Sequence, residues 1–143
     1  MGICGTASPK PARGTYLLER RKAKAEAKAN EDAVRKAVQK RDVRCRWPEP
    51  HVCVGGPLEA AHILDKSLCG PTIPENEILL CPWIHRRGPD SIHGKQLKVE
   101  KETAAGANGP LSFWRRSDDV DALGQPIYFC VARERAIGVI EKD

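Results

Sequence analysis

The residues that decide the fold are Leu58–Ile63, with the sequence LEAAHI, and Asn76–Arg87, with the sequence NEILLCPWIHRR. They lie within a window, Val43–Lys98, that holds all four histidines of the chain and four of its six cysteines. Histidine and cysteine supply general bases and metal ligands. We therefore look for chemistry in this window before looking elsewhere.

Short strands and a short helix are expected in this window. A Gly-Gly-Pro sequence separates Val52–Val54 from Leu58–Ile63, which predicts two strands on either side of a turn. The residues from Asn76 onward lead into a short helix near Pro82–Arg87. Proline is well tolerated at the first helical position, because its missing N–H has no helical partner there anyway.

The N-terminal part of the chain is basic. Residues 1–14 are rich in Gly and Pro and predict a disordered lead-in, whereas 16–41 contain neither and predict a helix. Residues 1–46 carry 13 Lys and Arg against 5 Asp and Glu, whereas the other 97 residues carry 11 against 14. A basic helical arm on a near-neutral body suits a polyanionic partner. A solvated helical face explains the charge alone equally well.

The C-terminal part predicts a β-hairpin. Leu111–Trp114 and Ile127–Ala132 have strand-like composition, and a turn-rich segment rich in Asp separates them. The predicted fold class is therefore small α+β. Its three parts are a lead-in and basic helical arm (1–42), a central core (43–98) and a C-terminal β extension (99–143).

The order strand, His62, loop, Asn76, helix, His85 suits hydrolysis of a phosphodiester. That reaction needs an activated water and a Lewis acid for the charge on the leaving oxygen. His62 at a strand end is placed to act as a general base, and His85 on the facing helix is placed to hold a metal ion. Asn76 at the turn is placed to fix the loop and orient the base.

These stretches resemble the HNH endonuclease family of phages and bacteria. The resemblance rests on Leu58–Ile63, on Asn76–His85 and on Cys45-Arg46-Trp47-Pro48, and the stretch Gly106–Trp114 resembles the extension that follows the motif. It implies a ββα-metal core over 43–98 that cuts DNA with a divalent ion, Mg²⁺ or Mn²⁺, with Zn²⁺ or Ni²⁺ as further candidates. It also implies that His62 is the base, that Asn76 holds the base and that His85 is a metal ligand.

One position departs from the family pattern. The family usually places a metal-binding Asp, His or Glu immediately before the base, and this chain has Ala61 there. Glu59 shares that face of the strand, because side chains alternate along a strand, and is one candidate for the second ligand. The others are Asp65 and His93. Alternatively, His62 itself binds the metal ion and another group serves as the base.

The cysteines raise a separate prediction of a structural zinc ion. The resemblance implies that Cys45 and Cys53 form one knuckle and that Cys81 opens a second. The expected partner position of Cys81 is an isoleucine, so Cys69 or His51 has to complete a tetrahedral site. The alternative is that these cysteines are small buried apolar residues.

The remaining expectations concern partners. Arg86, Arg87 and Lys95 flank the predicted metal ligands and are candidate phosphate contacts, although surface solvation explains them nearly as well. No feature predicts base reading, so we expect low sequence specificity, with a partner protein as one way to direct cleavage. The absence of a membrane-spanning stretch favours the cytoplasm of a bacterium or of a phage-infected host. The rival functions are a zinc-stabilised DNA-binding module without catalysis, derived from such a nuclease, and a protein-interaction module.

Overall fold

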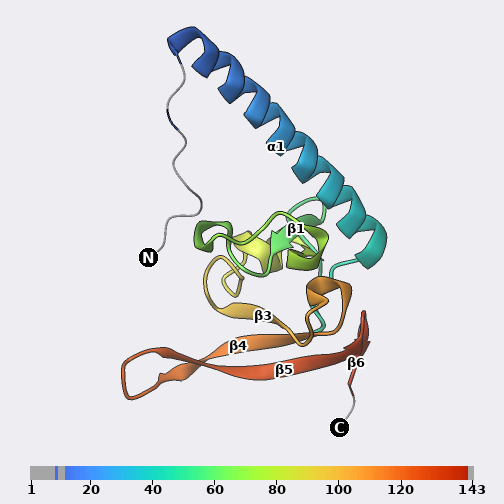
Figure 1. Ribbon diagram of the computed structural model, residues 1–143. Helices are drawn as coiled ribbons and strands as arrows, with labels where there is room; N and C mark the ends of the chain where they lie inside the picture. Colours follow the sequence, from blue (N-terminus) through green and yellow to red (C-terminus); the bar gives the residue numbers. More distant parts are fainter. Residues whose placement is uncertain (1–8, 10–11, 142–143) are drawn as a thin grey trace.

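The computed structural model describes residue 9 and residues 12–141, so most of the lead-in predicted over 1–14 lies outside the described residues. The described chain has one long helix and two antiparallel sheets, which confirms the α+β class (Figure 1). The first half of the helix extends away from the rest of the molecule, and the larger sheet lies on the opposite side of the body (Figure 1).

Helix α1, Arg13–Asp42, confirms the predicted arm. Its sequence is dominated by Ala, Lys, Arg and Glu, which favour helix. Residues 14–31 are exposed, and only the C-terminal half docks on the body. Val34 and Val38 pack there against Leu79 in a small apolar cluster. Arg41 secures the last turn by donating hydrogen bonds to the carbonyls of Pro74 and Glu77 at 2.6 Å each.

The smaller sheet pairs strand β1, Glu59–His62, with strand β2, Glu77–Leu80. The expected strand at Val52–Val54 was wrong, because that segment is a loop. Val52 is 76% exposed, whereas all four side chains of β2 are buried, and it is β2 that forms the antiparallel ladder with β1. The 3₁₀ turns η1, Lys66–Leu68, and η2, Pro74–Asn76, connect the two strands.

A short helical segment follows β2 directly. Segment η3, Trp83–Arg87, is a single turn of π-helix, in which the N–H of Gly88 donates to the carbonyl of Trp83 at 2.8 Å. It occupies the place where a short helix was predicted. Isolated π-helical turns are rare and often mark functional sites.

The larger sheet has the strand order β3-β4-β5-β6. The predicted hairpin is confirmed, because its two runs lie in strands β4, Leu111–Val120, and β5, Pro126–Ala136. Strands β3, Leu97–Lys101, and β6, Val139–Ile140, extend it on either side, and the 3₁₀ turn η4, Gly106–Asn108, precedes β4.

One apolar core joins the central part of the chain to the larger sheet. Trp47 packs edge-on against Phe113, with 5.5 Å between the ring centroids. The buried side chains of this core are Trp47, Ala61, Ile78, Leu80, Cys81, Ile84, Leu97, Val99, Ala107, Leu111 and Phe113. In the described part of the chain, no helix is both long enough and apolar enough to cross a membrane.

Candidate functional site

His62 is the last residue of β1, and a loop of 13 residues separates it from Asn76. Its ring lies between two side chains, with Nε2 at 3.3 Å from the hydroxyl of Thr72 and Nδ1 at 3.8 Å from the carboxylate of Glu77. The pKa of His62 is lowered mainly by burial and secondly by the nearby positive charge of Lys66. The ring is therefore neutral at pH 7, the state that a general base requires.

Asn76 ties this loop together. Its amide oxygen accepts from the N–H of Leu64 at 2.9 Å, and its amide nitrogen donates to the carbonyls of Leu64 and Pro71 at 3.1 and 3.0 Å. The loop is tight: a Cβ at Gly70 would lie 1.8 Å from the carbonyl oxygen of Leu64. The Asn76 side chain therefore holds this loop closed, through bonds to the backbone of Leu64 and Pro71.

His85 and His93 are brought together by the backbone. The N–H of Ile92 donates to the carbonyl of Ile84 at 2.9 Å, and that of His93 donates to the carbonyl of His85 at 3.0 Å. These two bonds close a loop of seven residues and bring the two imidazole rings together, with an angle of 87° between the ring planes. The two Nε2 atoms lie 3.1 Å apart.

Glu59 contacts the Nδ1 side of the His85 ring, away from the Nε2 atom that faces His93. Its carboxylate is 3.0 Å from Nδ1 of His85 and accepts two hydrogen bonds from Arg86, one on each oxygen, at 3.0 and 2.6 Å. The Arg86 guanidinium is the main cause that lowers the pKa of Glu59 to about 2. The ionised carboxylate keeps a hydrogen on Nδ1 of His85, which leaves the lone pair on Nε2. Glu59 thus orients His85 rather than pointing its charge into the pocket.

His62, His85 and His93 line one pocket of about 390 Å³. Asp65 and Lys95 stand on its wall, where Lys95 adopts a positive φ of 62°. Asp65 also caps the turn η1, because one of its oxygens accepts from the N–H and the hydroxyl of Ser67 at 2.8 Å each. Three histidines that are separated by up to 31 positions in sequence therefore face the same space.

The distance between His85 and His93 is one that a divalent cation could bridge. Two nitrogens that lie about 2.1 Å from one ion are about 2.9 to 3.4 Å apart, and the two Nε2 atoms match that spacing. The same 3.1 Å is a hydrogen-bond distance, so without a cation one ring can donate to the other. A carboxylate on the other ring nitrogen of a metal-binding histidine is a frequent outer partner, and Glu59 supplies it. Ala61 is buried in the core and offers no ligand atom.

The candidate phosphate contacts differ in whether their side chains already bond to other groups of the protein. Arg86 is held by Glu59, and Arg87 donates to the carbonyl of Gly55 at 3.2 Å. Lys95 is exposed beside the pocket, and Lys98 also lines it. The sequence did not single out Lys98, because the strand Leu97–Lys101 contains no recognisable motif.

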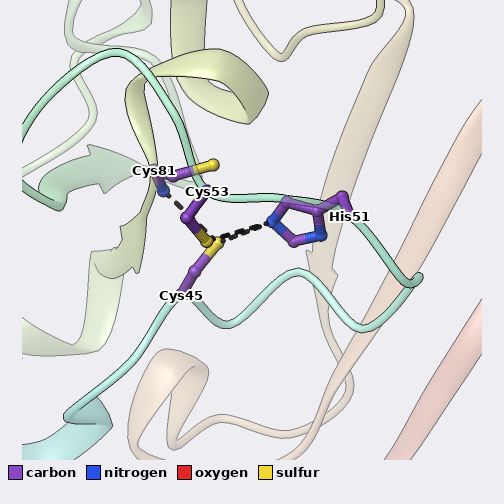
Figure 2. A group of neighbouring side chains, drawn as sticks. All are labelled: Cys45, His51, Cys53 and Cys81. Carbon is purple, nitrogen blue, oxygen red and sulfur yellow. Dashed lines mark hydrogen bonds between the residues drawn. The ribbon is translucent and has the colours of Figure 1, made fainter.

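A second cluster consists of Cys45, His51, Cys53 and Cys81, whose candidate ligand atoms all lie within 4.8 Å of one another (Figure 2). The loop after α1 supplies the first three residues, and the junction of β2 and η3 supplies Cys81. This group could hold a metal ion, as was predicted for the three cysteines. His51 is the fourth member, so the wide spacing of Cys45 and Cys53 is bridged by a histidine in the same loop.

The orientation of His51 is fixed by its backbone partner. Its Nδ1 lies 2.7 Å from the carbonyl oxygen of Glu49, which only accepts, so Nδ1 carries the hydrogen and Nε2 presents its lone pair. Nε2 lies 3.4 Å from the sulfur of Cys45 and 3.5 Å from that of Cys53. Burial raises the pKa of the Cys45 thiol to about 12, so a bound cation is needed to favour its thiolate at neutral pH.

These distances fit tetrahedral zinc. With Zn–S of about 2.3 Å and Zn–N of about 2.0 Å, sulfur and nitrogen ligands lie about 3.5 Å apart. Both sulfur–nitrogen distances in the cluster match this value. Three cysteines and one histidine are also a donor set found in structural zinc sites.

No protein-family model, curated protein or solved structure matches this chain.

Proposed function

We propose that this protein is a metal-dependent endonuclease of the HNH (ββα-metal) type that hydrolyses DNA phosphodiester bonds with low intrinsic sequence specificity. The observation that carries the proposal is the shared pocket of His62, His85 and His93, in which two imidazole nitrogens lie at a cation-binding distance. The antiparallel pair β1–β2 followed by η3 supports it, because this order puts a strand-end histidine and a helical histidine on one pocket.

In this proposal, some residues bind the cation and another transfers a proton. His85 and His93 would hold the cation through Nε2, and Glu59 orients His85. When bound there, Mg²⁺, Mn²⁺ or another divalent ion supplies Lewis-acid stabilisation of the charge on the leaving oxygen. His62 takes a proton from the attacking water and returns it to solvent. The water oxygen bonds to phosphorus, the bond to the leaving oxygen breaks, and that oxygen is protonated by solvent.

Positive charge around the pocket supports a nucleic-acid substrate. Lys66, Lys95 and Lys98 line it against one carboxylate, that of Asp65. Away from the pocket, α1 carries further exposed lysines and arginines along its length. Phosphate contacts of this kind bind DNA without reading its bases, which fits low specificity.

A plasmid-nicking assay tests the proposal. The wild-type protein, His62→Ala and His85→Ala are compared with EDTA, with Mg²⁺ and with Mn²⁺, and DNA binding is followed by gel shift at low salt. We expect metal-dependent nicking by the wild type. His62→Ala should lose nicking and keep DNA binding, whereas His85→Ala should also lose cation binding. Binding of DNA without nicking in any metal ion would overturn the nuclease proposal.

Two observations favour a second candidate, a zinc-stabilised DNA-binding module without catalysis. The cluster of Cys45, His51, Cys53 and Cys81 could hold a structural metal ion apart from the histidine pocket, and Ala61 leaves that pocket without the ligand that the family usually has before its base. The same assay separates the two, because this module binds DNA and requires zinc, yet leaves the plasmid intact.

A further inference from the structure

Glu77 is a buried carboxylate in an otherwise apolar strand. The three residues that follow it in β2 are Ile78, Leu79 and Leu80, and all are buried. Glu77 itself is only 5% exposed, and within the described structure its Oε2 atom has no hydrogen-bond partner. Burying a carboxylate oxygen without a partner costs folding free energy, so packing alone does not account for a glutamate here.

The residue directly opposite Glu77 is His62. The two are cross-strand partners in the β1–β2 pair, and Oε1 of Glu77 lies 3.8 Å from Nδ1 of His62. On its other side, Nε2 of His62 meets the hydroxyl of Thr72 at 3.3 Å. The three side chains line the groove between α1 and β1. Glu77 therefore faces Nδ1, and the Thr72 hydroxyl stands at Nε2, where an attacking water has to take its place.

Other charged groups also act on this pair. Glu31 of α1 and Lys66 of η1 form an ion pair of 2.9 Å beside the groove, and both influence the pKa values of His62 and Glu77. Asp65 also acts on His62, and Arg41 acts on Glu77. Of these carboxylates, Glu77 is the one that an ion-pair distance joins to the His62 ring.

We propose that Glu77 is a positioning residue that keeps the hydrogen of His62 on Nδ1, so that Nε2 is the atom that accepts the proton of the attacking water. This inference rests on the proposed function. A carboxylate beside Nδ1 favours that tautomer and stabilises the imidazolium that forms when Nε2 takes a proton. Burial of Glu77 thus costs folding free energy, and in return the base His62 has a fixed orientation.

The test compares Glu77→Gln and Glu77→Leu with the wild type, and uses Glu31→Gln as a matched control that removes a charge from the same groove. Nitrogen NMR of the histidine rings at pH 8 reads the tautomer of His62, and a pH titration reads its pKa. We expect both Glu77 variants to lose the preference for a hydrogen on Nδ1 and to lower the pKa of His62, whereas Glu31→Gln should keep the tautomer.

Stability and nicking provide two further readouts. Glu77→Leu should raise the melting temperature, because it removes the buried oxygen that has no partner. The same substitution should lower kcat for nicking by about 10- to 100-fold and leave KM for DNA unchanged. An unchanged tautomer and an unchanged His62 pKa in both Glu77 variants would overturn the inference. Because the tautomer is read without DNA, a wild type that fails to nick would count against the nuclease proposal alone.

Discussion

The three histidines of the pocket differ in what holds them. His85 and His93 are set by two backbone hydrogen bonds and by Glu59, whereas His62 is held by side chains from the loop and from β2. The sequence singled out His62 and His85 from their order along the chain. It left His93 as one of three candidate ligands, because the backbone bonds that bring His93 to His85 leave no trace in composition or spacing.

The protonation of His62 gives a pH prediction. Its pKa is lowered by burial below the ordinary value of 6.5, so the unfolded chain binds this proton more readily than the folded chain. The free energy of unfolding should therefore fall as the pH drops from 6.5 through the lowered pKa of His62, and His62→Gln should reduce this dependence. Urea denaturation at pH 7.5 and 5.5 measures it.

The nicking rate should depend on the same protonation of His62. A general base works in its neutral form, so we expect the acid limb of the nicking rate to have its midpoint below pH 6.5. Glu59, with a pKa of about 2, stays ionised throughout this range, whereas burial also lowers the pKa of His85, so protonation of His85 adds to the same limb. An acid limb centred above pH 6.5, or the same urea pH dependence in His62→Gln, would contradict this account of His62.

At the scale of the elements, much of α1 lies outside the core. Residues 14–31 are exposed, and docking relies on Val34 and Val38 near the C-terminal end. The helix was predictable because alanine and long charged residues favour helix locally. The pairing of β1 was not, because a strand finds its partner through buried contacts, and β2 lies 15 residues beyond β1.

Neutralising the arm should weaken DNA binding in a salt-dependent manner. A triple variant, Arg21→Gln, Lys24→Gln and Lys28→Gln, keeps good helix formers at exposed positions. The slope of log affinity against log salt should become shallower by about 0.9 for each DNA phosphate that the arm no longer neutralises. Fluorescence anisotropy with a labelled duplex at several salt concentrations measures this slope.

Acidic residues of the same helix provide the control for the arm. Glu19 and Glu26 are exposed like the three basic residues, so Glu19→Gln with Glu26→Gln should strengthen binding or leave it unchanged. If both sets of substitutions lower the affinity equally, loss of the helix rather than loss of charge is responsible, and α1 is not a phosphate-binding arm.

At the scale of the whole molecule, a few buried groups join distant parts of the chain. Arg46 is buried and donates to the carbonyls of Ala107 and Gly109 and to the carboxylate of Glu134, which connects the segment after α1 to η4 and β5. The cluster of Cys45, His51, Cys53 and Cys81 joins the same segment to the β2–η3 junction. Both connections cross long stretches of sequence.

Removing metal should therefore loosen the whole fold. We expect about one zinc per chain by elemental analysis, and a strong chelator should lower the melting temperature, because the binding free energy of a structural metal contributes to folding. Cys53→Ser should lose the zinc. Cys130→Ser is the matched control, because Cys130 is also an exposed, free thiol and lies in β5 outside the cluster. Equal zinc content in the two variants would exclude the cluster as the zinc site.

The sequence by itself determined the α+β class, the helical arm, the hairpin and the histidines worth testing, because local propensity and the spacing of scarce residue types are properties of short stretches. Only the tertiary structure decided that β1 pairs with β2, that His51 joins the three cysteines, that Glu59 orients His85 and that Glu77 faces His62. Those contacts arise from burial and from backbone hydrogen bonds between distant segments, and no local pattern encodes them.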